Sequence, residues 1–315
     1  MISTPFDPSA EGPRREDAVL ERIVEILGGK GLLKEIRNIG DDCAVLEPFV
    51  GQTLVSTDVC VYGVHLDDQI FGVEDLGYKA MTSAISDIAA MGGRVRGALI
   101  GVSAPAGTDL ELLHHGVADA AAVTGCPVVG GDLTQSNQLA VSVTVLGECP
   151  GGGAVLRSGA RPGDTLLVTG PLGRSAAGLR RARAGVALND ELVLAHRHPW
   201  PRLAEGQAAR GASASAMMDL SDGLGLDLHR LADASGVGVE LTDLPVAEGA
   251  TTEEAWSGGE DYELLIATSD PDRLALVFAD RGLRAPLVIG RCVEDATSRR
   301  YRGADLPRSG YQHSW

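Results

Sequence analysis

Residues 74–93 read EDLGYKAMTSAISDIAAMGG, and this stretch predicts a long helix that ends at its two glycines. Apolar side chains recur along it at four-residue intervals, so one stripe of the helix is expected to pack into a core. The stripe beside it consists of Lys79, Ser83 and Asp87. Asp87 is therefore expected at the edge of an apolar face.

Strand and helix patterns alternate on both sides of this helix. Residues 1–15 are polar and rich in proline, and they are expected to form a disordered tail. The first half contains predicted helices at about 15–28 and 108–124, and predicted strands at 43–47, 52–61, 94–104, 126–130 and 139–148. Glycine and proline crowd residues 149–164, which predicts a boundary between an N-terminal domain, 16–150, and a C-terminal domain, 151–315.

The second half alternates in the same way. Predicted strands lie at 165–170, 216–220, 237–241, 262–268 and 286–292, and predicted helices lie at 173–185, after 201, at 222–235 and at 271–281. Aromatic residues make up only 4% of a chain rich in alanine and glycine. The sequence therefore predicts a two-domain α/β or α+β protein.

The composition excludes several classes of protein. The chain has 315 residues and a formal net charge of −16 at pH 7, so it would repel a polyanion, and nucleic acid binding is not expected. Its five cysteines form no CxxC pair, which argues against a disulfide framework or a zinc site. The N-terminal stretch does not resemble a signal peptide, and no window of about 18 residues is apolar throughout, so we expect a cytoplasmic protein without a membrane span.

Seven aspartates stand at abrupt ends of apolar runs. They are Asp41, Asp42, Asp58, Asp87, Asp132, Asp219 and Asp222. Carboxylates gathered beside strands repel one another and resist burial, so bound cations are expected to neutralise them. Magnesium prefers oxygen ligands and usually joins one or two carboxylates to substrate phosphates. The aspartates therefore suggest magnesium-dependent phosphoryl transfer from a nucleotide.

The common phosphate-binding loops do not account for nucleotide binding in this sequence. GGKG at 28–31 lacks the Ser or Thr that follows the P-loop lysine, and no complete G-x-G-x-x-G occurs. TGPLGRSAAG at 169–178 enters a helix, so its N–H groups could hold an anion or belong to an ordinary turn. Asp222 stands where a helix is expected to begin, and it could cap that helix without binding metal.

Six segments, read in order, resemble the thiamine-monophosphate kinase family of the aminoimidazole ribonucleotide synthetase superfamily. They are IGDDCAVL, STDVCVYGVHL, YKAMTSAISDIAAMGG, GGDLT, LSDGL and GGEDYELL. The resemblance runs from about residue 16 to the C-terminus. It implies a two-domain aminoimidazole ribonucleotide synthetase-like fold, a homodimer that pairs through the sheets of its N-terminal domains, and ATP in a cleft between the domains. The reaction implied is transfer of phosphate from ATP to thiamine monophosphate, giving thiamine diphosphate, the last step of its biosynthesis.

The resemblance also implies roles for individual residues. Several magnesium ions would be held by Asp41, Asp42, Ser56, Thr57, Asp58, Asp87, Asp132, Asp219 and Asp222. ATP would contact Gly131, Asp132, Arg157 and Ser221, and thiamine monophosphate would contact His65, Glu260 and Tyr311. Alternatives stay open for His65, which could be structural, and for Glu260, which could belong to a polar turn. The other histidines, including His196 and His313, are expected to be solvated or packed.

Two departures from the family pattern bear on these roles. Leu133 in GGDLT replaces a threonine that relatives often carry, which removes a hydroxyl that could assist a phosphate contact. Ser314 follows His313 where relatives usually have an aromatic residue, so stacking on the substrate by Tyr311 or by Trp315 stays open.

The implied reaction needs no dedicated general base. The second pKa of a phosphate group is about 6, so the acceptor oxygen is already mostly deprotonated at neutral pH. Direct in-line transfer without a phosphoenzyme is therefore predicted. Two rival interpretations stay open: another superfamily member, such as aminoimidazole ribonucleotide synthetase, selenophosphate synthetase or a hydrogenase-maturation protein, and a non-enzymatic acidic metal-binding scaffold.

Overall fold

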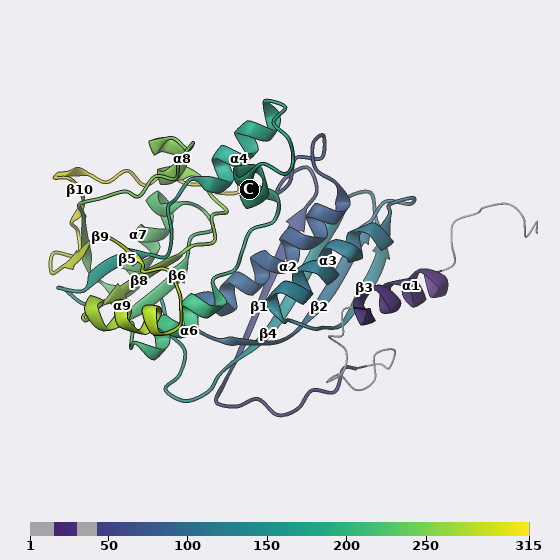
Figure 1. Ribbon diagram of the computed structural model, residues 1–315, viewed down its shortest axis with the longest axis horizontal. Coiled ribbons are helices and arrows are strands. Elements are labelled where there is room, and N and C mark those ends of the chain that lie inside the picture. The colour runs from purple at the N-terminus through teal and green to yellow at the C-terminus, as the bar shows by residue number, and fades with distance from the viewer. Residues whose placement is uncertain (1–15, 30–42, 315) are drawn as a thin grey trace, which may run out of the picture.

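Two separate β-sheets organise the chain, one from each half (Figure 1). The computed structural model describes residues 16–29 and 43–314. Both halves combine strands and helices, so the predicted mixed α/β architecture is confirmed. Within the described ranges, no helix has the length and apolar character needed to cross a membrane.

The first sheet has four strands in the order β1-β4-β2-β3. They are β1 (Gln52–Val61), β2 (Arg94–Ala104), β3 (Val128–Gln135) and β4 (Ala140–Cys149). Helices α2 (Val73–Ala90) and α3 (Leu110–Thr124) lie side by side over one face of this sheet, and α1 (Glu16–Gly28) packs against α3 (Figure 1). Inward-facing valines, Val141, Val143 and Val145, are fully buried beneath these helices.

Glycines allow α2 and α3 to approach closely. A Cβ atom on Gly116 would lie 1.8 Å from the carbonyl oxygen of Glu74, and one on Gly77 would lie 2.1 Å from that of Leu113. Any larger side chain at either position would force the helices apart. This close contact fixes the position of α2, which carries Asp87.

No helix among the described residues covers the opposite face of the first sheet. Val55, Val59 and Leu99 on that face are 67%, 45% and 39% exposed. Apolar side chains that gather on an exposed sheet face indicate an interaction surface.

The second sheet has seven strands in the order β11-β10-β7-β9-β5-β8-β6. They are β5 (Thr165–Val168), β6 (Ala216–Asp219), β7 (Gly238–Leu241), β8 (Leu264–Thr268), β9 (Leu287–Val293), β10 (Arg299–Tyr301) and β11 (Ala304–Asp305). Its helices are α4 (Arg174–Arg183), α5 (Glu191–Arg197), α6 (Leu203–Gly211), α7 (Leu224–Ser235), α8 (Thr252–Ser257) and α9 (Pro271–Asp280). Alternate residues of β6 and β8 face two cores, one with α7 and one with α6 and α9.

Helix α2 belongs to both halves. Its end, at Ala89 and Ala90, packs into the same core as α6 and α9. Gly206 of α6 lies so close that a Cβ atom there would be 2.1 Å from the carbonyl oxygen of Ala89. The long helix predicted from residues 74–93 is therefore the element that joins the two sheets.

Some predicted elements differ from the structure. The strand expected at 43–47 does not form. The short helices α5 and α8 were not predicted, because each has fewer than eight residues and too few turns to show a helical spacing of apolar residues. The strand expected at 126–130 continues to Gln135, since β3 pairs with β2 through Asp132 and beyond. Asp132 thus lies inside a strand rather than at the end of an apolar run. The tail predicted at 1–15 lies outside the described residues.

Candidate functional site

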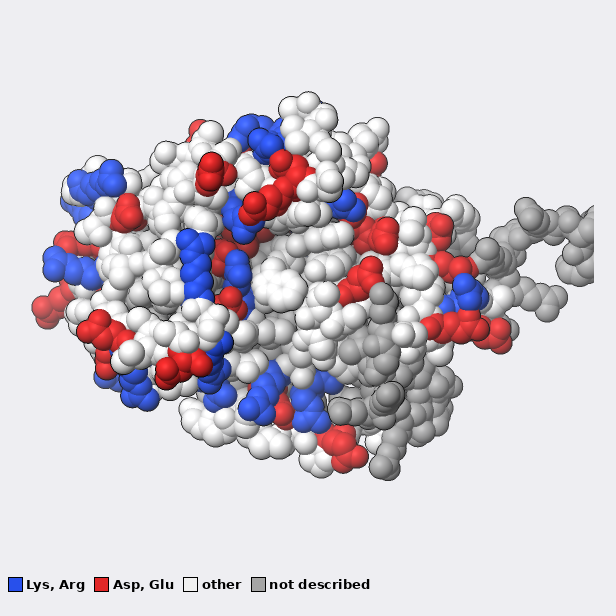
Figure 2. All heavy atoms as spheres, in the orientation of Figure 1, with Lys and Arg blue, Asp and Glu red and all other residues white. Residues whose placement is uncertain are grey.

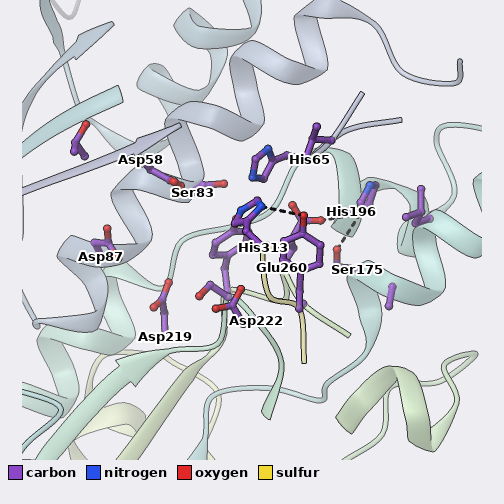
Figure 3. Close-up of a pocket in the computed structure, with 18 residues that line it drawn as sticks. Asp58, His65, Ser83, Asp87, Ser175, His196, Asp219, Asp222, Glu260 and His313 are labelled. Atoms are coloured by element: carbon purple, nitrogen blue, oxygen red, sulfur yellow. Dashed lines mark hydrogen bonds and ion pairs between the residues drawn. The ribbon is translucent and has the colours of Figure 1, made fainter. Parts of the chain in front are cut away.

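A cavity of about 450 Å³ lies between the two halves, and both contribute to its wall (Figure 3). A volume of this size suits a small-molecule ligand. The predicted site residues that line it are Thr57, Asp58, His65, Asp87, Asp219, Ser221, Asp222, Glu260 and Tyr311. Ser56 does not line it directly but donates a hydrogen bond from Oγ to Oδ2 of Asp87, 2.5 Å away.

Asp58 and Asp87 form the acidic side of the cavity in the first half. Asp58 lies on β1 on the face that meets α2, and Asp87 extends from α2 (Figure 3). Burial raises the pKa of the Asp87 carboxyl, and the neighbouring charge of Asp58 raises it too, whereas the Ser56 hydrogen bond and Arg157 oppose the shift. The two carboxylates therefore repel each other in the free protein.

Asp219 brings a carboxylate from the second half to the same place. It ends β6, and its Oδ2 atom accepts a hydrogen bond from Oγ of Ser86 on α2, 2.6 Å away. Burial raises the pKa of Asp219 to about 7, and the charge of Asp87 contributes to the shift. Aspartates distant in sequence are thus held together by α2 and β6.

Asp222 lies beside Asp219 but does not cap a helix. Helix α7 has Gly223 at its N-cap without a side-chain cap, and the N–H of Asp222 itself donates to Oδ2 of Asp227 at 2.9 Å. Arg230 forms ion pairs with both Asp222 and Asp227. The capping alternative for Asp222 is therefore wrong, and its carboxylate faces the cavity (Figure 3).

Gly131 and Asp132 lie away from this cavity. Asp132 pairs with Gly101 of β2, whose neighbours Ile100 and Val102 are buried toward the helices, so Asp132 is on the uncovered face. Two strands, β4 and β2, separate β3 from β1. Within a single chain, Asp132 therefore does not lie next to Asp58.

The remaining predicted ligands lie elsewhere. Arg157 lines an adjoining cavity of about 350 Å³, which also includes Ser56 and which shares Asp87 and Asp219 with the site. Asp41 and Asp42 lie outside the described residues.

The other end of the cavity carries His65, Glu260 and Tyr311. Nδ1 of His65 accepts a hydrogen bond from the N–H of Val61 at 3.0 Å, so a neutral His65 carries its proton on Nε2. Glu260 forms an ion pair with the buried Lys79 at 2.7 Å. The N–H of Tyr311 donates to the carbonyl oxygen of Asp222 at 2.9 Å, which holds the C-terminal segment at the cavity.

Two histidines that were expected to be solvated or packed, His196 and His313, line the cavity. The ring centroid of His313 lies 5.6 Å from that of His65 and 5.0 Å from that of Tyr311. His196 is buried, and its Nδ1 lies 2.9 Å from Oγ of Ser175. Burial lowers the pKa of His196 to about 2, so this ring is neutral. Trp315, the other candidate for stacking, lies outside the described residues.

The TGPLGRSAAG turn does not offer its helix N-terminus to a ligand. Asp261 accepts hydrogen bonds from the N–H groups of Gly173 and Ser175 at 2.6 and 3.0 Å. This carboxylate takes the place that an anion would occupy at the start of α4. The ordinary-turn alternative is correct.

Asp261 is expected to make stability depend on pH. Burial raises the pKa of its carboxyl to about 7, although the backbone hydrogen bonds oppose the shift. The unfolded carboxyl titrates near pH 4, so its contribution to stability is complete below about pH 4 and is lost as the pH rises through 7. Asp261→Asn should therefore show a smaller fall in the free energy of unfolding between pH 5 and 8 than the wild type, measured by urea denaturation. Asp270→Asn, at the exposed cap of α9, is the control; an equal slope in all three proteins would contradict the prediction.

Neither sign of charge dominates the face of the molecule shown in Figure 2. Lys and Arg are mixed with Asp and Glu there. Within the described part of the chain, no three His, Cys, Asp or Glu side chains lie close enough to hold one metal ion.

Family models match most of the chain. The AIR synthase related protein N-terminal domain matches residues 40–149, and the corresponding C-terminal domain matches residues 161–302. The thiamine-monophosphate kinase of Mycobacterium tuberculosis is 38% identical over 272 residues, which cover 81% of this chain and 81% of that relative. The chain belongs to the thiamine-monophosphate kinase family.

Solved structures of the thiamine-monophosphate kinase family share this fold. The enzyme of Stenotrophomonas maltophilia superposes with a TM-score of 0.80 at 29% identity and covers 90% of this chain and 96% of its own. AaThiL complexed with AMPPCP and TMP superposes with a TM-score of 0.75 at 30% identity and covers 97% of this chain and 100% of its own. The resemblance seen in the six sequence segments is confirmed.

Proposed function

We propose that this protein transfers phosphate from ATP to thiamine monophosphate, giving thiamine diphosphate and ADP. The proposal rests on one observation. The same cavity has aspartates of both halves on one side and His65, Glu260 and Tyr311 on the other. The AaThiL structure contains AMPPCP, an analogue of ATP, together with TMP, which supports the same pair of substrates here.

Magnesium ions are proposed to accompany the nucleotide. Asp58, Asp87, Asp219 and Asp222 supply hard oxygen ligands, and burial together with the neighbouring charge of Asp87 raises the pKa of Asp219. Magnesium usually takes one or two carboxylates and completes its octahedron with phosphates and water, so pairs of these residues suffice. When bound, such ions would cancel repulsion between the two phosphorylated substrates. By resemblance, Asp41, Asp42, Ser56, Thr57 and Asp132 complete the proposed ligand set.

The protein's own residues would act by positioning. His65, Glu260 and Tyr311 are proposed to hold the organic part of the acceptor, and Gly131, Asp132, Arg157 and Ser221 the nucleotide. The acceptor oxygen is mostly deprotonated at neutral pH, so no side chain needs to remove a proton. We propose direct in-line transfer without a phosphorylated enzyme.

A homodimer through the first sheet is also proposed. The exposed Val55, Val59 and Leu99 support it, because pairing two such faces would remove them from water. Asp132 lies on the same face, so a second chain would cover its surroundings. Light scattering of the purified protein tests the dimer: a monomer at micromolar concentration would contradict it.

In the presence of ATP and magnesium, thiamine monophosphate is expected to cause the release of ADP. The coupled assay is run with magnesium and again with excess EDTA, because chelation should abolish turnover and added magnesium should restore it. Release only with another acceptor would favour a different superfamily member, and no release with any acceptor would favour a binding protein. Mass spectrometry after single turnover should find no phosphorylated side chain.

A further inference from the structure

Lys79 is the one lysine within the described residues, and it is buried completely inside the protein. It lies on α2, on the helical stripe that also carries Ser83 and Asp87. Burying an ammonium group is unfavourable unless partners replace its lost water. The partners of Lys79 therefore indicate which interactions stabilise its buried ammonium group.

The two partners come from different segments outside α2. Nζ of Lys79 donates a hydrogen bond to the carbonyl oxygen of His65 at 2.9 Å and forms an ion pair with Oε2 of Glu260 at 2.7 Å. His65 belongs to the turn after β1, and Glu260 belongs to the loop before β8. One buried cation thus joins the two halves at the substrate end of the cavity.

Glu260 depends on its surroundings for its conformation. Its φ angle is +67°, a left-handed value that non-glycine residues rarely adopt, and its N–H donates to the carbonyl oxygen of Ser221 at 2.8 Å. His196 also approaches Glu260, with Nδ1 3.6 Å from Oε2, but burial lowers the pKa of His196 to about 2. The cation that faces Glu260 is therefore Lys79.

We propose that Lys79 is a positioning residue that holds His65 and Glu260 at the spacing required to bind the acceptor. The inference rests on the proposed function, since those two residues are the proposed acceptor contacts. Lys79 is absent from the wall of the cavity, so it acts through them rather than by touching the substrate.

Lys79→Met is expected to raise KM for thiamine monophosphate by about ten- to a hundredfold, because a displacement of about 1 Å can cost a hundredfold in rate or binding. KM for ATP should change less than threefold. Methionine keeps the length of the side chain but leaves the partly buried carboxylate of Glu260 without its cation, so folding must be measured as well. Steady-state kinetics with each substrate varied in turn gives the comparison, and circular dichroism confirms folding.

Glu260→Gln supplies the second arm of the experiment. If Lys79 acts through Glu260, the double variant should have nearly the same KM for thiamine monophosphate as Lys79→Met alone. Independent, multiplying effects would overturn the proposal. If Lys79→Met fails to fold, Glu260→Gln alone must still raise this KM selectively, and an unchanged value would overturn it.

Arg202→Met is a matched control. Arg202 pairs with Glu263 at 2.5 Å, and both residues line a different cavity. This variant should lose stability without a selective change in KM for thiamine monophosphate. A wild type without turnover of thiamine monophosphate would defeat the proposed function itself, whereas an active wild type and an unaffected Lys79→Met variant would defeat only this inference.

Discussion

Asp58→Asn is expected to lower kcat for ADP formation by about a hundred- to a thousandfold while the protein remains folded. Removing one group that stabilises charge in a transition state typically has an effect of about this size. Asparagine keeps the shape of the side chain and can still accept the hydrogen bond that the N–H of Val59 donates to Oδ1 at 2.8 Å. Among the described residues, the substitution removes only the negative charge that faces Asp87 and breaks no favourable ion pair.

Steady-state kinetics and thermal denaturation check this prediction together. Asp109→Asn is the matched control, since Asp109 caps α3 outside the cavity and asparagine caps helices about as well as aspartate. The control should keep wild-type kcat and Tm. A kcat for Asp58→Asn within threefold of wild type would rule out a metal role for this carboxylate.

Asp219→Asn should change activity and stability in opposite directions. Its kcat is expected to fall by about a hundredfold, because a proposed metal ligand loses its charge. Its Tm at pH 8 is expected to rise, because burial raises the pKa of Asp219 to about 7 and the ionised carboxyl destabilises the folded protein above that pH. Asparagine can still accept the hydrogen bond from Ser86.

The pH at which this stabilisation appears follows from the direction of the pKa shift. The unfolded carboxyl loses its proton near pH 4, whereas the folded one holds it until about pH 7. The favourable contribution of wild-type Asp219 is therefore complete below about pH 4 and lost as the pH rises through 7. Thermal denaturation at pH 5 and at pH 8 should show a larger gain for the variant at pH 8. A loss of Tm at pH 8 would contradict the prediction.

The sequence predicts best those features that depend on neighbouring residues. The long helix with Asp87 was predicted from its period, because apolar spacing is a local property of the chain. The family resemblance also identified nine residues that line one cavity. The resemblance implied that these residues share one site, whereas local sequence patterns alone do not show which of them lie close together.

The features that were missed depend on distant contacts. Two strands separate β3 from β1, and the alternation of side chains along each strand puts Asp132 and Asp58 on different faces of one sheet although their sequence patterns look alike. Asp261 reaches the start of α4 from a segment 88 residues away, and no local signal shows that it occupies that helix end. His196 and His313 reach the cavity through irregular segments whose paths the sequence pattern does not determine.

Helix α2 sets a fixed length within the site. Lys79 and Asp87 are eight residues apart on it, which corresponds to about 12 Å along the helix axis. A stiff helix packed against both sheets cannot stretch, so the proposed anchor for one end of the acceptor and the proposed metal-binding carboxylate at the other keep a constant separation. The distance between these two points of the cavity is thus constant. We expect the cavity to favour acceptors in which the ring system and the terminal phosphate are separated by a matching length.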